Sequence, residues 1–194
     1  MPVQIEDVVR YAVPNPVVFE AATFAYHALT HTLANRTDIL GDYVKVLMDE
    51  LAEQMVIQWL KEHGKRVEPV VDKGAIQPDL RHEIWVTDIR GVKVRAAVHT
   101  FLSTNKAELV EILAHHSLSV DTNQMCGINI SVVYWYQLRE KPRTKLPSLQ
   151  NTAIIGWASD KNFREKLQPG ITSRFAAIPF TELRSMDSLL QFLV

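Results

Sequence analysis

The stretch QPDLRHEIWVTDIRGVKVRAAVHTFLST, residues 77–104, decides the fold because it predicts two strands joined by a tight turn. Both halves are rich in β-branched and aromatic residues, which favour strands. Between them, Gly91 supplies the turn residue. We therefore expect a β-hairpin here, and the remaining elements are placed before and after it.

Alternation gives this hairpin two different faces. One face is apolar and predicts the core side: Leu80, Ile84, Val86, Val92, Val94, Ala96, Val98 and Leu102. The other face carries mainly charged and aromatic side chains: Asp79, Arg81, Glu83, Trp85, Thr87, Lys93, Arg95, Ala97, His99 and Phe101. This second face is either a solvated surface with ion pairs such as Glu83 with Arg95, or one wall of a functional site. A register slip of one residue would exchange the two faces.

Two helices are expected before the hairpin. Residues 17–36 predict the first, with an apolar stripe made by Phe19, Ala22, Tyr26, Leu29 and Leu33. Residues 42–64 predict a longer second helix, with Asp42 as its N-cap and Gly64 at its end. Its stripe repeats along the whole length: Val44, Leu47, Met48, Leu51, Met55 and Trp59. Such a helix must dock on a sheet or on another helix.

The other elements alternate between strands and helices. An edge strand is expected around Pro69, which cannot donate to a ladder. After the hairpin we expect a helix at 105–118 capped by Thr104 or Asn105, strands at 127–140 and 151–159, a helix at 160–167, a strand at 174–180 and a helix at 181–193 with Thr181 as its N-cap. This order predicts a single α/β domain with a mixed central sheet flanked by helices. Its parts are an N-terminal arm and helix (1–37), a core (38–140) and C-terminal strands and helices (141–194).

Composition narrows the functional classes. The chain has 194 residues, 47% apolar and 22% charged, with a formal net charge of −1. This charge argues against strong non-specific DNA binding but allows a local basic patch. The single cysteine, Cys126, excludes an internal disulfide and a multi-cysteine zinc site. We expect a cytoplasmic protein without a membrane span, because no signal-peptide pattern or apolar run of about 20 residues is present.

The segment from Asp42 to Leu138 resembles a known family core. Its order of long helix, strand, Pro-Asp strand, strand, helix and strand is similar to the PD-(D/E)xK nuclease superfamily, also called the restriction-endonuclease-like fold. The tail is also similar to small members of this family, with a Gly156-Trp157 strand, a short helix and an Ile178-Pro179 strand. In that family, the aspartate after proline and an acid-x-lysine pair on the next strand hold Mg²⁺ and activate water.

The resemblance implies a degenerate motif in this chain. Asp79 matches the motif aspartate, but the acid and lysine positions fall on Ala97 and His99. Alanine offers no ligand atom, a single carboxylate is a poor Mg²⁺ site, and histidine is not a constant cation. Three acids are candidates to replace the missing one: Glu83 on the same face, and Glu50 or Glu53 on the long helix.

If the chain cuts nucleic acid, these residues have expected roles. Asp79 and Glu83 are the predicted metal ligands for Mg²⁺ or Mn²⁺, with Glu50 as a further carboxylate and His99 in the lysine position. Four cations are candidates to contact phosphate: Lys93, Arg95, Arg143 and Lys145. The loop that holds the last two is more typical of a solvated connection between strands than of a phosphate contact.

Two functions stay open. One is a catalytically degenerate domain without a cofactor, which associates with DNA or binds a partner subunit. The other is an active Mg²⁺- or Mn²⁺-dependent phosphodiesterase with a rearranged site. The missing lysine and the near-neutral charge favour the first. A third hypothesis, small-molecule binding at Trp85 and Phe101, has only aromatic content behind it. The small residues of the first helix also suggest a homodimer through that helix.

Overall fold

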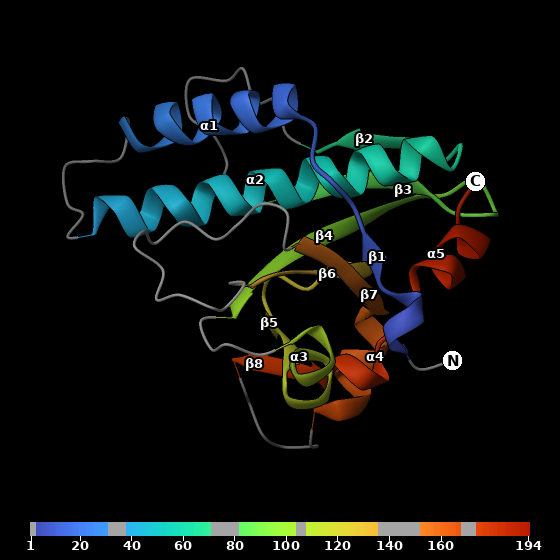
Figure 1. Ribbon diagram of the computed structural model, residues 1–194. Coiled ribbons are helices and arrows are strands. Elements are labelled where there is room, and N and C mark those ends of the chain that lie inside the picture. Colours follow the sequence, from blue (N-terminus) through green and yellow to red (C-terminus); the bar gives the residue numbers. More distant parts are fainter. Residues whose placement is uncertain (1–2, 31–37, 71–81, 104–107, 136–151, 168–173) are drawn as a thin grey trace.

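The structure is a computed structural model that describes residues 3–30, 38–70, 82–103, 108–135, 152–167 and 174–194. Its centre is a six-stranded mixed sheet with the order β1-β7-β6-β4-β3-β2 (Figure 1). These strands are β1 (Val9–Arg10), β2 (Val67–Pro69), β3 (Glu83–Thr87), β4 (Lys93–Ser103), β6 (Ile128–Trp135) and β7 (Thr152–Ser159). Strands β4 and β6 are parallel, and the other neighbours are antiparallel. A second sheet pairs β5 (Ser117–Asp121) with β8 (Phe175–Pro179).

Helices cover both faces of the large sheet (Figure 1). The long helix α2 (Ile39–Glu62) and the last helix α5 (Met186–Phe192) pack on one face, and α1 (Asn15–Thr30) lies on the outside of α2. The other face is covered by α3 (Leu109–His115), α4 (Asp160–Lys166) and the β5–β8 sheet. Short 3-10 turns are η1 (Ile5–Asp7) and η3 (Phe180–Glu182). The α/β prediction of a mixed sheet flanked by helices is confirmed.

The strands of the hairpin pair without the one-residue slip that would exchange its two predicted faces. Glu83 pairs with Ala97 and Trp85 pairs with Arg95, so the charged face is continuous across both strands. The apolar face packs under α2, where Ile84 is fully buried. Gly91 takes a positive φ of 80° in the turn, which only glycine adopts without strain. β2 is an edge strand, as its proline predicts.

The stripe of α2 is confirmed, but its start is not. All six predicted stripe residues are buried, and Gly64 follows the helix with a positive φ of 73°. The N-cap is Asp38, whose side chain accepts from the Gly41 N–H, so α2 begins a turn before the predicted Asp42. Gly41 does not break the helix, because the Asp38 side chain accepts from one of the first free N–H groups of α2.

The predicted stripe of α1 is wrong in part. Phe19 is 74% exposed and Tyr26 is 62% exposed, whereas Ala21, Ala25 and Ala28 are buried against α2. The small side chains allow the two helix backbones to approach closely, and this close approach replaces burial of the aromatic rings. The alanines that suggested a homodimer therefore lie inside one chain, and the dimer itself stays a prediction.

Smaller corrections concern the other elements. Two strands were not predicted: β1 has only two residues, and the first two residues of β5 were assigned to the end of a helix. The N-cap of α3 is Glu108. The C-terminal helix starts after Ser185, because the segment with Thr181 forms the 3-10 turn and a bridge between Arg184 and Trp157 follows it. Among the described residues, no helix is long and apolar enough to span a membrane.

Candidate functional site

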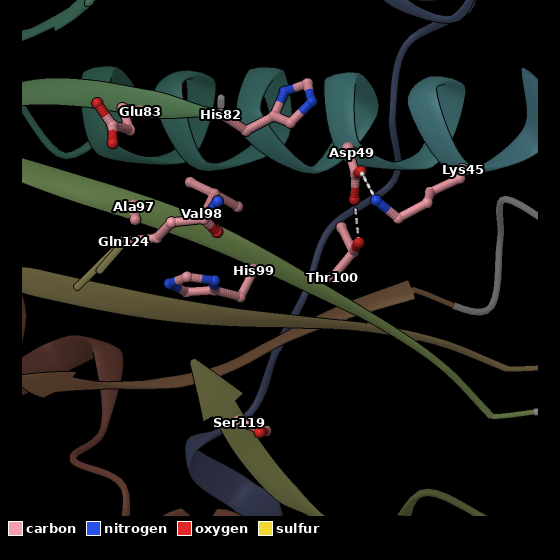
Figure 2. Close-up of a pocket in the computed structure, with 10 residues that line it drawn as sticks. All are labelled: Lys45, Asp49, His82, Glu83, Ala97, Val98, His99, Thr100, Ser119 and Gln124. Atoms are coloured by element: carbon pink, nitrogen blue, oxygen red, sulfur yellow. Dashed lines mark hydrogen bonds and ion pairs between the residues drawn. The ribbon is translucent and has the colours of Figure 1, made fainter. Parts of the chain in front are cut away.

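A pocket of about 300 Å³ lies beside the part of β4 that extends past β3. β3 pairs with residues 93–97 of β4, whereas β6 pairs with residues 96–103, so β4 continues beyond its β3 neighbour. The pocket therefore receives side chains from both sides of the sheet (Figure 2). Its lining residues are Lys45, Asp49, His82, Glu83, Ala97, Val98, His99, Thr100, Ser119 and Gln124.

Both positions of the expected acid-x-lysine pair line this pocket. Ala97 is buried and offers no ligand atom. His99 is partly buried, and its Nε2 lies 3.1 Å from Asn129 Oδ1. Burial lowers the pKa of His99, although the Asn129 contact and the charge of Asp49 act in the opposite direction. His99 is therefore a neutral imidazole near pH 7, and it does not supply the constant positive charge of a lysine.

Glu83 lies next to Ala97, as the same-face register predicted, and its carboxylate is already engaged. Arg95 donates to Glu83 Oε2, and Cys126 Sγ lies 3.5 Å from Glu83 Oε1. Glu83 is 6% exposed, whereas the side chain of Arg95 is 40% exposed. The pair therefore holds a buried carboxylate beneath a partly solvated guanidinium. The sequence left two options for this face of the hairpin, and the Glu83–Arg95 ion pair belongs to the option of a solvated surface.

The opposite wall of the pocket comes from α2. Thr100 Oγ1 donates to Asp49 Oδ1, and Lys45 Nζ lies 3.7 Å from Asp49 Oδ2 (Figure 2). His99 and Ser119 lie on the other side of β4 in the same view. Asp49 was not a predicted site residue, although it lies four residues after Lys45 and next to the predicted Glu50. The rotation of α2 about its axis places Asp49 over the part of β4 that continues beyond β3, and the sequence does not give this rotation.

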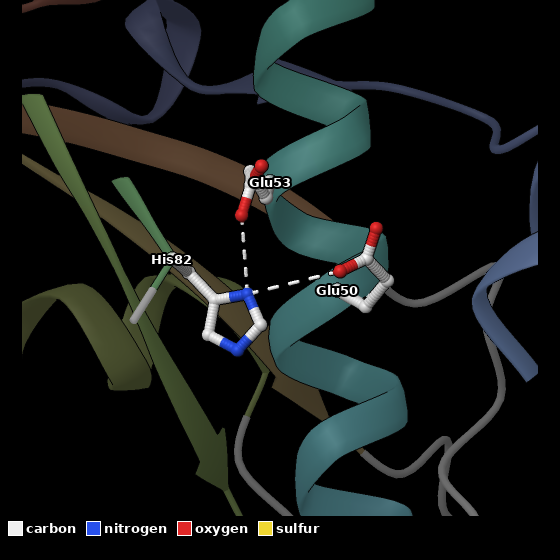
Figure 3. A group of neighbouring side chains, drawn as sticks. All are labelled: Glu50, Glu53 and His82. Atoms are coloured by element: carbon white, nitrogen blue, oxygen red, sulfur yellow. Dashed lines mark hydrogen bonds and ion pairs between the residues drawn. The ribbon is translucent and has the colours of Figure 1, made fainter. Parts of the chain in front are cut away.

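Glu50 and Glu53 lie next to the pocket and point to His82, which was not a predicted site residue. His82 Nδ1 lies 3.2 Å from Glu53 Oε2 and 4.0 Å from Glu50 Oε2 (Figure 3). His82 precedes β3 by one residue and shares the α2 side of the sheet with Ile84. The acids of the long helix thus meet His82, whereas Glu83 and His99 lie on the other side of the sheet.

The remaining predicted site residues are the four phosphate contacts and the metal ligand Asp79, and only some of them are described by the structure. Lys93 Nζ lies 2.9 Å from Glu68 Oε2, and Arg95 contacts Glu83, so both described cations already have a carboxylate partner. Asp79, Arg143 and Lys145 lie outside the described residues. The structure therefore gathers Glu83 and His99 at one pocket, with Glu50 beside it, and gives Lys93 a place at the far end of the hairpin.

The aromatic pair of the small-molecule hypothesis is not assembled into one wall. Phe101 makes a tilted ring contact with His116, with centroids 4.6 Å apart, and contacts Phe180 edge-on at 6.0 Å. Trp85 pairs across the hairpin with Arg95. The pocket is instead lined mostly by polar side chains, which suits hydrogen bonding and ion binding more than apolar ligands.

No family model, curated protein or solved structure matches this chain. The chemistry of the site is therefore inferred from its residues. Carboxylates and imidazoles can hold a divalent cation or transfer protons. In the described residues, Glu83 and Asp49 lie near a cation, Glu50 and Glu53 lie beside His82, and His99 contacts Asn129.

Proposed function

We propose that this chain is a restriction-endonuclease-like domain without cleavage chemistry, which works as a partner-binding subunit. The observation that carries the proposal is the pair Ala97 and His99 at the two motif positions. Ala97 cannot ligate a metal, and the lowered pKa of His99 leaves its ring uncharged near neutral pH. A phosphodiester cleavage site needs charge at both positions to hold the metal and stabilise the transition state.

The ion pairs of the hairpin support the same proposal. Glu83, the acid closest to Ala97, is neutralised by Arg95, and Lys93 is paired with Glu68. Contact with nucleic-acid phosphate would have to displace these carboxylates. Of the four predicted phosphate contacts, Arg143 and Lys145 are then the remaining candidates.

The outer face of α1 favours a protein partner. Phe19 and Tyr26 lie seven residues apart on the side away from α2, and both rings are mostly exposed. Aromatic side chains are enriched at protein interfaces, where they contribute strongly to binding. A second copy of the chain is one candidate partner, and measurement of the molar mass in solution at increasing concentration tests it.

The first experiment is nicking of supercoiled plasmid with Mg²⁺ and then Mn²⁺. Wild type, Asp79→Ala and Glu83→Gln are purified identically. We expect no metal-dependent nicking that differs among the three proteins, because Ala97 and His99 lack the required charge. Nicking by wild type that disappears in Asp79→Ala would contradict the proposal.

An active metal-dependent phosphodiesterase is the second candidate. The observation in its favour is that carboxylates from α2 and β3 surround the edge of one polar pocket. Under this alternative, Glu83→Gln must also abolish nicking, because Glu83 would be the second metal ligand. Loss of nicking in Asp79→Ala alone would place the second ligand on the α2 side, at Asp49 or Glu50.

A further inference from the structure

Three side chains that can ligate a metal converge where the start of β3 meets α2 (Figure 3). Glu50 and Glu53 are three residues apart, so they project from the same side of the helix. His82 approaches them from the chain that leads into β3. The potential ligand atoms of the three residues all lie within 4.8 Å of one another.

All three groups are nearly shielded from solvent. Glu50 and Glu53 are 3% and 1% exposed, and the side chain of His82 is 8% exposed. Glu50 Oε1 also accepts a hydrogen bond of 3.1 Å from Gln54 Nε2. Carboxylates at this depth require cations or hydrogen-bond donors around them. A dication stabilises two carboxylates at once and takes the neutral imidazole as a third ligand.

We infer that Glu50, Glu53 and His82 bind one divalent transition metal, with Zn²⁺ as the ion that fits best. Tetrahedral Zn²⁺ with bonds of about 2.1 Å holds its ligand atoms roughly 3.4 Å apart. The distances of 3.2 and 4.0 Å from His82 Nδ1 to the two carboxylates bracket this value. A mixed nitrogen and oxygen set suits Zn²⁺ or Mn²⁺ better than Mg²⁺ or Ca²⁺, which prefer oxygen alone.

The neighbouring pocket supplies a route for the ion and space for water. His82 belongs to the pocket lining as well as to the cluster, so a metal on its ring is adjacent to a volume of about 300 Å³. Three protein ligands then leave the fourth position of the metal for a water molecule. The site is different from the expected Asp79 and Glu83 metal site, because Glu83 faces the other side of the sheet.

Bound metal would fasten the start of β3 to the middle of α2. The two ligands on α2 and the one before β3 are 29 or more residues apart in the chain, so a metal links distant segments. This role is independent of the proposed function, since it involves neither Ala97 nor His99. A nicking result that contradicts the proposed function therefore leaves the metal site unaffected. A zinc titration that contradicts the metal site likewise leaves the proposed function unaffected.

The test uses the full chain after EDTA treatment and desalting. Isothermal titration with Zn²⁺ is expected to give one saturable site per chain, and Mg²⁺ is expected to give none. Zn²⁺ at a free concentration 100-fold above its Kd should lower the equilibrium constant of unfolding about 100-fold. Thermal unfolding with and without Zn²⁺ measures this stabilisation.

Matched variants identify the ligands. Glu53→Gln and His82→Gln each remove one ligand with little change in side-chain volume, and we expect each to lose the Zn²⁺ binding heat and the Zn²⁺-dependent stabilisation. Glu20→Gln and His115→Gln change exposed residues of the same types on α1 and α3 and should behave as wild type. Wild-type Zn²⁺ affinity in both ligand variants, or no saturable binding by wild type, would overturn the inference.

Hydrogen exchange keeps the inference testable if a variant does not fold. Zn²⁺ added to the wild-type chain should slow amide exchange in residues 39–62 and 82–87, the two segments that the metal would join. Exchange in residues 15–30 should not change, because α1 carries no ligand. Unchanged exchange in the first two segments would overturn the metal site without use of any variant.

Discussion

Asn129 determines which ring nitrogen of His99 carries the proton. Its Nδ2 donates to the Cys126 carbonyl at 2.8 Å, which leaves Oδ1 as the acceptor for the other contacts. Oδ1 accepts from the Cys126 N–H at 3.3 Å and lies 3.1 Å from His99 Nε2. His99 therefore donates through Nε2–H, and its neutral form leaves Nδ1 as an acceptor.

His99 gives the chain a predictable pH dependence. Burial lowers its pKa below the ordinary value of 6.5, so the unfolded chain binds this proton more readily than the folded chain. The free energy of unfolding should therefore decrease as pH falls below about 6.5, by at most about 1.4 kcal/mol per pH unit from this one group. His99→Gln retains a donor for Asn129 but does not titrate, and it should reduce that slope.

Urea unfolding followed by tryptophan fluorescence between pH 5 and pH 8 measures the difference. Wild type and His99→Gln differ only at this residue, so the comparison isolates the buried ring. Equal slopes in the two proteins would show that His99 is not the group responsible.

The sequence contained enough information to place Glu83, but not His82. Alternation put Glu83 on the same face as Ala97 and near it, and the structure pairs the two residues directly. His82 and Ile84 are two residues apart and therefore point to the same face of the sheet, the one covered by α2. The contact between His82 and Glu53 also depends on how α2 is rotated over the sheet. Helix rotation is set by tertiary packing, and one sequence does not reveal it.

At the scale of elements, α1 is the segment whose packing depends on small residues. Ala25 is fully buried against Val46, Leu47 and Leu51 of α2. Ala25→Leu inserts three further carbon atoms into this contact, which should cost about 1–3 kcal/mol by overpacking. Because the core cluster of α1 is shared mainly with α2, the strain should release α1 and leave the sheet intact.

Hydrogen exchange resolved by peptide tests this expectation. Residues 15–30 should exchange faster in Ala25→Leu than in wild type, whereas residues 128–135 of β6 should not change. Glu20→Leu adds an apolar side chain at an exposed position of the same helix and is the control. Equal acceleration throughout the chain would mean that α1 is part of the same cooperative unit as the sheet.

Strong periodic signals predicted elements well, and short or mixed signals did not. α2 and β7 were predicted because each has a long regular pattern or a continuous apolar run. β5 alternates in SLSVD, with Leu118 and Val120 buried, but its first two residues were taken as the end of the preceding helix. The stripe of α1 was misjudged because hydrophobicity ranks Phe19 above Ala25, whereas close helix packing selects the smaller side chain.

At the scale of the whole molecule, the last residues join parts of the chain that lie far apart. The Val194 N–H donates to the Thr87 carbonyl at 2.9 Å, and its carbonyl accepts from the Arg66 N–H at 3.0 Å. Leu193 is 2% exposed and belongs to the same core cluster as Trp59 of α2. The end of this segment thus connects α5, β3 and the start of β2 around one core.

Leu193→Ala should therefore weaken the core as a whole. Truncation of a buried leucine costs about 2–5 kcal/mol through lost burial and the cavity that remains. Since α2, β3 and α5 share this cluster, tryptophan fluorescence and far-UV circular dichroism should shift to lower urea together. Val194→Ala changes a side chain that is 40% exposed and should have a much smaller effect. If the two probes separated in Leu193→Ala, with the helix signal unchanged, the C-terminal segment would be an appendage and the core under α2 would be stable without it.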